Sequence, residues 1–237
     1  MTREIRLLSG SAAQGLAGQA QAALLAQFDV ALHGTFGAVG AMRDKLLTGE
    51  ACDAVILTQQ LIDQLITEGH VVAGSATALG VVRTGVAVKV GKSQAGAKPD
   101  ISTADGLKSA LLAADAVYFP DPVKATAGIH FMKVLRTLGI ADELGARLRA
   151  FPNGATAMRE MAAAPGNNVI GCTQVTEILF SAGVQLVGLL PRQFELATVY
   201  TAGVCTKAQQ PQAATDFIAL LAGDQMRAAR EAGGFDA

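Results

Sequence analysis

The sequence is short of charge and of aromatic side chains, and both shortages exclude classes of partner. Charged residues make up 16% of the 237 positions, aromatic residues make up 5%, and tryptophan is absent. The 19 Lys and Arg nearly balance the 20 Asp and Glu, which leaves a net charge of −1. We therefore expect neither the positive surface that attracts nucleic acid nor an aromatic platform on which bases stack.

Long apolar runs are also missing. No run approaches the roughly 20 residues that a membrane-spanning helix needs, so we expect no membrane insertion. Residues 1–11 lack the apolar stretch of a secretory signal peptide. As written, the sequence predicts a cytoplasmic protein; it predicts a periplasmic one if a signal peptide was removed and a Met added.

Nothing in the sequence indicates a metal or an organic cofactor. The three cysteines (Cys52, Cys172 and Cys205) each lie in an apolar run without a CxxC spacing, so we expect buried thiols rather than metal ligands or disulfides. Residues 10–15 have the glycine spacing of a phosphate-binding loop, but Leu16 and Ala17 stand where that loop needs Lys and Ser or Thr. The sequence therefore gives no support for the binding of ATP or of a dinucleotide cofactor.

What the chain does contain is a hydrophobic fraction of 51%, arranged as short apolar runs alternating with stretches of helical periodicity. This alternation is typical of α/β folds with parallel sheets. The expected strands are residues 5–8, 29–33, 53–57, 81–88, 116–119 and 195–204, with strand–helix pairs at 151–161 and 169–179. The expected helices are 16–28, 34 to about 49, the segments after 58, 103 and 126, and 211–232.

These elements predict an α/β protein of two lobes joined by two long β crossings. Residues 1–82 with 204–237 would form the first lobe, and residues 83–203 the second. Because ligands of open α/β sheets bind at the carboxyl ends of strands, we expect the ligand in a cleft between the lobes, which close by a hinge motion.

Small hydroxyl- and glycine-rich turns follow several of the expected strands. They lie at 9–11, 34–35 and 124–128, with weaker copies at 153–156 and 173–174. Helix starts offer unpaired N–H groups that bind anions, and Ser or Thr adds a donor. Ordinary helix capping explains any single turn. Their repetition in both lobes favours an anion-binding site.

The same turns carry a family resemblance. Leu-Leu-Ser-Gly-Ser at 7–11, Gly-Thr-Phe-Gly at 34–37, Asp-Ala-Val-Ile-Leu-Thr at 53–58 and Thr-Ala-Gly-Ile at 126–129 occur in an order that resembles the molybdate-binding proteins of ABC importers. The resemblance covers essentially the whole chain. It implies the two-lobe type 2 periplasmic-binding-protein fold, with an oxyanion held by two Ser of the first lobe and by N–H groups and a Tyr of the second.

Carried over to this sequence, the resemblance places the first Ser at Ser11, or at Ser9 if the register slips, and the second at Thr35. The Tyr position aligns with Thr173, so that ligand group is missing. The candidate ligand-binding residues, from turns and resemblance together, are Ser9, Ser11, Thr35, Arg83, Thr84, Lys124, Thr126, Ala127, Gly154, Thr173 and Gln174.

The chain also resembles a divergent subgroup, similar to aconitate isomerase, in Arg-Thr-Gly at 83–85, Lys-Pro-Asp-Ile-Ser at 98–102 and Gln-Val-Thr-Glu-Ile at 174–178. Arg83 suits a carboxylate, because its planar guanidinium pairs with two oxygens. An interlobe salt bridge is the alternative role for Arg83. The missing Tyr and the added Arg predict that molybdate is not the preferred ligand.

Two functions stay open. The first is reversible capture of a small anion, either a carboxylate or a tetrahedral oxyanion, with an ABC permease as partner only if the protein is exported. The alternative is a cytoplasmic isomerase that moves a proton in an unsaturated di- or tricarboxylate. Such an enzyme needs a base, for which His33 and Glu177 are the candidates.

Overall fold

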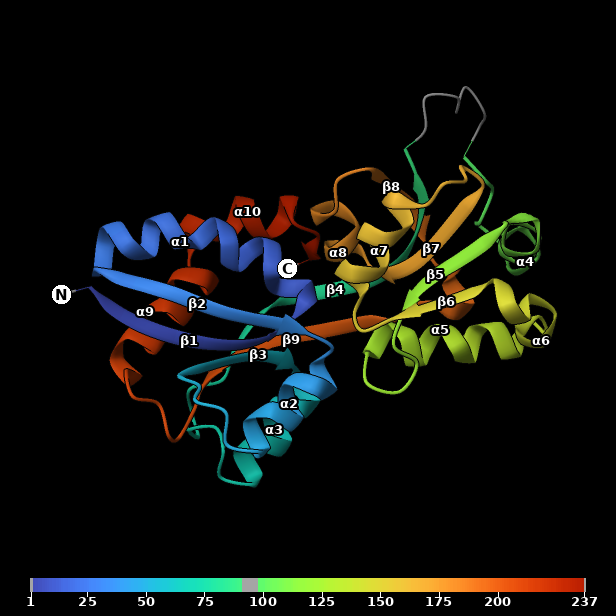
Figure 1. Ribbon diagram of the computed structural model, residues 1–237. Coiled ribbons are helices and arrows are strands. Elements are labelled where there is room, and N and C mark those ends of the chain that lie inside the picture. The colour runs from blue at the N-terminus through green and yellow to red at the C-terminus, as the bar shows by residue number, and fades with distance from the viewer. Residues whose placement is uncertain (1, 91–97, 237) are drawn as a thin grey trace. The chain divides into compact units, whose positions relative to one another are not determined.

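The computed structural model describes residues 2–90 and 98–236 (Figure 1). Its contacts divide the chain into two compact units: unit 1 is Met1–Val82 with Thr198–Ala237, and unit 2 is Arg83–Ala197. The strands β4 (Thr77–Lys89) and β9 (Ala197–Val204) each run from one unit into the other. The second boundary thus lies at Thr198, whereas the sequence analysis placed it at residue 204. Most of the loop expected at 91–99 lies outside the described residues.

Unit 1 is built on a mixed sheet in the order β2, β1, β3, β9. The strands β1 (Arg3–Gly10), β2 (Val30–Gly37) and β3 (Ala54–Thr58) are mutually parallel, and β9 pairs antiparallel with β3. The short strand β10 (Phe235–Asp236) pairs with the start of β4. Because three neighbouring strands are parallel, their carboxyl ends share one edge of the sheet.

Helices cover this sheet on both sides (Figure 1). The helix α1 (Gln14–Phe28) packs with α9 (Pro211–Ala222) and α10 (Arg227–Ala232), whereas α2 (Val39–Leu47) and α3 (Gln59–Thr67) pack against the parallel strands. The buried core includes Ile5, Leu7, Leu24, Ile56 and Phe217. Burial of such apolar surface is the main stabilising contribution to the unit.

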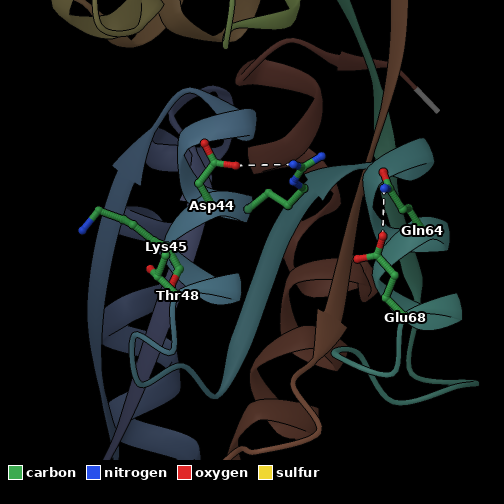
Figure 2. A network of polar contacts seen from close by, with 6 residues as sticks. Asp44, Lys45, Thr48, Gln64 and Glu68 are labelled. Atoms are coloured by element: carbon green, nitrogen blue, oxygen red, sulfur yellow. Dashed lines mark hydrogen bonds and ion pairs between the residues drawn. The ribbon is translucent and has the colours of Figure 1, made fainter.

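Polar side chains of α2 and α3 bond along their own helices (Figure 2). Gln64 of α3 donates to Glu68, the residue that follows this helix, at 2.9 Å. The hydroxyl of Thr48, which follows α2, donates to the backbone carbonyl of Lys45 at 3.0 Å. These exposed pairs contribute a few tenths of a kcal/mol each, ~0.2–0.5 in isolated helices.

Unit 2 has a sheet in the order β4, β7, β5, β6, with β8 also paired to β4. The strands β5 (Ala116–Pro120), β6 (Leu148–Phe151) and β7 (Val169–Gln174) are parallel, and β4 runs antiparallel to both β7 and β8 (Val184–Leu189). Its helices are α4 (Ala104–Ala113), α5 (Thr126–Thr137), α6 (Ala141–Leu144), α7 (Gly154–Ala163) and α8 (Val175–Phe180).

The fold confirms the predicted alternation of strands and helices and corrects one segment. Residues 34–37 do not open a helix: they continue β2, paired in register with 7–10 of β1, and α2 begins at Val39. The glycines that suggest a turn are there because a side chain at Gly37 would contact Met42, and one at Gly34 would contact the ring of Phe36. The strand β8 and the helix α6 were not predicted.

All three cysteines are buried, as expected, with free thiols. Burial raises the pKa of the Cys172 thiol well above its ordinary value. The pKa of Cys205 is also raised, first by a hydrogen bond with the Cys52 thiol and then by burial. Among the described residues, no helix is both long and apolar enough to cross a membrane.

Asp53, which directly precedes β3, is the polar centre of unit 1. Its buried carboxylate accepts three backbone N–H bonds: from Arg6 at 2.8 Å, Gln209 at 2.7 Å and Gln210 at 2.9 Å. These donors belong to β1 and to the turn before α9, so one side chain connects three separate segments. Removing such an acceptor leaves backbone N–H groups without a partner, which lowers the stability of the fold.

We expect Asp53→Ala to lower the free energy of unfolding by ~2–4 kcal/mol, because three backbone N–H groups lose a buried, charged acceptor. Urea denaturation followed by circular dichroism measures this. Asp63→Ala, which removes an exposed carboxylate on α3, is the matched control and should change stability by less than ~0.5 kcal/mol. Equal stability of the two variants would contradict the role given to Asp53.

Candidate ligand-binding site

Three helices of unit 2 begin where its parallel strands end. The helix α8 follows β7 without a gap, α7 follows β6 after two residues, and α5 follows β5 after the turn 121–125. Since the strands are parallel, all three helix starts lie at the same edge of the sheet. Backbone N–H groups therefore converge where ligands of such sheets bind.

Buried polar side chains without partners gather at this edge. Thr84 and Gln174 are opposite each other in the β4–β7 register, and Thr176 lies two residues further, in the first turn of α8. All three are at least 95% buried, yet the two threonine hydroxyls and both polar atoms of the Gln174 amide have no hydrogen-bond partner. Among the described residues, the remaining atom of this kind is Nε of Arg43, in unit 1.

Thr173 and Glu177 lie beside this group. The Thr173 hydroxyl donates a short hydrogen bond to Oε2 of Glu177, and both side chains are buried. The same two oxygens occupy the space that a side chain at Gly154 would need, at the first residue of α7. Glycine at 154 is thus what lets the carboxyl group lie against the start of α7. We call Thr84, Thr173, Gln174, Thr176 and Glu177 the strand-end cluster.

The turn between β5 and α5 is held by Asp121. Its Oδ1 accepts the backbone N–H groups of Val123 at 2.7 Å and Lys124 at 2.9 Å. No side chain caps α5, whose first residue is Thr126 and whose second, Ala127, is buried. A Cβ at Gly128 would collide with the carbonyl of Pro120, so the glycine allows α5 to start directly against the end of β5.

In unit 1, the predicted hydroxyls lie in two places. Ser9 is buried at the end of β1 and donates to the carbonyl of Gly10 at 2.9 Å, and Ser11 opens the 3₁₀ turn that follows. Thr35 lies inside β2 rather than at a helix start. With His33 it lines a cavity of about 710 Å³ that also includes Arg6 and Glu50.

His33 is therefore four residues from the end of its strand, not at the end as expected. Its ring is exposed, with Nε2 3.6 Å from Oε1 of Glu4. This placement favours a surface role for His33. Glu177 remains as the candidate base that lies at a strand end.

In two of the motifs shared with the divergent subgroup, a charged residue bonds to another residue of unit 2. Arg83 forms an ion pair with Glu195, and both side chains are about one-third exposed and belong to unit 2. The salt bridge is thus not between the lobes. Asp100 accepts from the N–H and hydroxyl of Ser102, and these bonds lower the pKa of its carboxyl group. Residues 98–102 thereby shape the turn that leads into α4.

Of the predicted residues, the structure thus places Thr84 opposite Gln174, and it brings Thr173 and Glu177 together at Gly154. Thr126 and Ala127 lie at a neighbouring helix start. Sequence reasoning missed Thr176 as a site residue. The signal available for it was a second polar residue in the first turn of a helix that begins directly after a buried strand. Among residues 2–90 and 98–236, no group of three or more His, Cys, Asp or Glu could hold a metal.

Two lobes of this kind, with polar groups at their strand ends, define the two-lobe type 2 fold of periplasmic binding proteins. The family described as bacterial extracellular solute-binding protein matches residues 5–236, and the chain belongs to that family. Aconitate isomerase from Pseudomonas sp. is 29% identical over 198 residues, which cover 81% of this chain and 71% of that protein.

Solved structures agree on the fold. The periplasmic molybdate-binding protein of Azotobacter vinelandii superimposes with a TM-score of 0.79 at 18% identity, covering 98% of this chain and 99% of the other. The sulfate-binding protein SubI from Mycobacterium tuberculosis H37Rv gives a TM-score of 0.75 at 15% identity, covering 98% and 86%. At these identities the likeness establishes the fold alone.

We expect Gly154→Ala to lower the free energy of unfolding by ~1–3 kcal/mol, because the new methyl group displaces the Glu177 carboxyl and the Thr173 hydroxyl. Gly18→Ala in α1, where a Cβ meets nothing within 4 Å, is the control and should stabilise by ~0.5–1 kcal/mol. Adding Glu177→Ala to Gly154→Ala should recover part of the loss. Purely additive effects in urea denaturation would contradict this contact.

Proposed function

We propose that this protein reversibly binds a small organic acid at the strand-end cluster of unit 2. The observation that supports this most is the set of partnerless polar atoms on Thr84, Gln174 and Thr176. Each would cost ~1–3 kcal/mol if left unsatisfied, so a ligand or water that supplies partners is favoured. Membership in a solute-binding family makes a captured small solute the natural occupant.

The chemistry of Gln174 favours an organic acid over an inorganic oxyanion. Its amide leaves one donor, Nε2, and one acceptor, Oε1, without partners. A fully ionised tetrahedral oxyanion offers only acceptors, so it can bond with Nε2 but not with Oε1. A carboxylate that also carries a hydroxyl or an acid proton satisfies both atoms. The nearby threonine hydroxyls can donate or accept as the ligand requires.

The contribution of unit 1 remains a prediction. Ser9 and Ser11 lie at the carboxyl end of β1, where a second set of ligand contacts is expected in a protein with this fold. Thr35 is the weaker candidate, because it lies within a strand. An ABC permease as partner, and the compartment in which the protein acts, are likewise proposals that follow only if the protein is exported.

Isothermal titration calorimetry tests the ligand class, with citrate, isocitrate, cis- and trans-aconitate, molybdate, tungstate and sulfate as titrants. We expect a di- or tricarboxylate to bind, and Gln174→Leu to weaken that binding ~10- to 100-fold, because the amide bonds are lost. Gln64→Leu, on the exposed side of α3, is the control. Binding of inorganic oxyanions alone, or full affinity in Gln174→Leu, would refute the proposal.

A second candidate function is isomerisation of an unsaturated tricarboxylate, favoured by the buried carboxyl group of Glu177 and by the likeness to aconitate isomerase. In such an allylic shift, a base removes a proton from one carbon, the double bond moves, and a proton is returned to another carbon, with no net redox change. Glu177 would act as the base. The amide of Gln174 or the hydroxyl of Thr84 would stabilise the enolate-like intermediate.

NMR tests this function. The protein is incubated with cis- or trans-aconitate in deuterated water, and isomerisation and deuterium uptake are followed in the spectra. We expect isomerisation with deuterium uptake in the wild type, and loss of both in Glu177→Gln with substrate affinity kept within a few-fold. Glu160→Gln, which removes a carboxylate on α7 that is 43% exposed, should keep the activity. If aconitate binds but neither isomerises nor takes up deuterium, the protein is a binding protein and not an isomerase.

A further inference from the structure

The start of α7 holds one of the chain's own carboxyl groups. Oε2 of Glu177 and the hydroxyl of Thr173 lie in the space that a Cβ at Gly154 would fill. Glu177 belongs to α8, so this is a contact between two helices. The helix α7 has ten residues, and its first N–H groups carry the positive end of the helix dipole.

The side chain of Asn153 satisfies one donor there, accepting the N–H of Thr156 at 2.9 Å. The Glu177 carboxyl lies on the same first turn, fixed by the bond from Thr173. A carboxylate placed at a helix start acts on that helix as a bound anion does. The Glu177 carboxyl therefore occupies space at the start of α7.

We propose that Glu177 is a specificity-determining residue that excludes inorganic oxyanions from the strand-end cluster. An approaching sulfate or molybdate would meet a buried carboxylate where a helix start would otherwise attract it, and like charges at short range in a buried site repel strongly. A ligand with a hydroxyl or a protonated carboxyl can donate to Glu177 instead. The inference rests on the proposed function, since it requires the ligand to bind at this cluster.

Removal of the charge is therefore predicted to change the class of anion that binds. Glu177→Gln keeps the size of the side chain and removes its negative charge, and Glu177→Ala also opens the space at Gly154. In calorimetric titrations with sodium molybdate and sodium sulfate, both variants should bind at least ~10-fold more tightly than the wild type. Circular dichroism and thermal unfolding establish that each variant is folded.

Two control variants distinguish the effect of the Glu177 charge from the effects of its hydrogen bond and of the net charge. Thr173→Val removes the hydrogen bond but keeps the carboxylate, so it should gain no oxyanion binding. Glu160→Gln removes an exposed carboxylate from α7 itself and should behave as the wild type, which shows that net charge is not the cause.

Two results overturn the inference. One is a micromolar Kd for molybdate or sulfate in the wild type, a measurement that needs no variant. The other is a folded Glu177→Gln or Glu177→Ala protein with no gain in oxyanion binding. If the wild type instead binds no organic acid while the variants gain molybdate, the proposed ligand is wrong and the role of Glu177 stands.

Discussion

The hydrogen bond from Thr173 to Glu177, made in the space left open by Gly154, is the constraint around which the candidate site is organised. It joins the end of β7, the start of α8 and the start of α7. Because these two oxygens occupy the space beside residue 154, a side chain there would displace them.

The two units differ in whether these buried polar side chains have hydrogen-bond partners. In unit 1, Asp53 and Thr201 are buried and bonded, the first to three backbone N–H groups and the second to Gln59 at 2.6 Å. In unit 2, Thr84, Gln174 and Thr176 are as deeply buried but without partners. Fully bonded groups stabilise a fold, whereas partnerless ones cost stability. This contrast supports the proposed binding of a ligand at the strand-end cluster.

The shared architecture carries different ligand chemistry in its relatives, which bind molybdate or sulfate according to their names, and one of which is an isomerase. A fold of this kind supplies helix starts at strand ends, and a few side chains there select the ligand. For this chain, the proposed selecting residues are Gln174, whose amide has two partnerless atoms, and Glu177 with its carboxyl group. Both favour ligands that can donate a hydrogen bond as well as accept one.

The sequence by itself determined the alternation of strands and helices, the two-lobe class, and the strand–helix pair that contains Gln174 and Glu177. Local periodicity and turn chemistry carry this information, because they depend on residues close in the chain. Only the tertiary structure decided that residues 34–37 extend β2, since pairing with β1 outweighs the turn preference of two glycines. Likewise, Thr84 meets Gln174 and Gly154 meets Glu177 only through packing between distant segments. No local pattern encodes such contacts, which is why the sequence could propose candidate residues but not their arrangement.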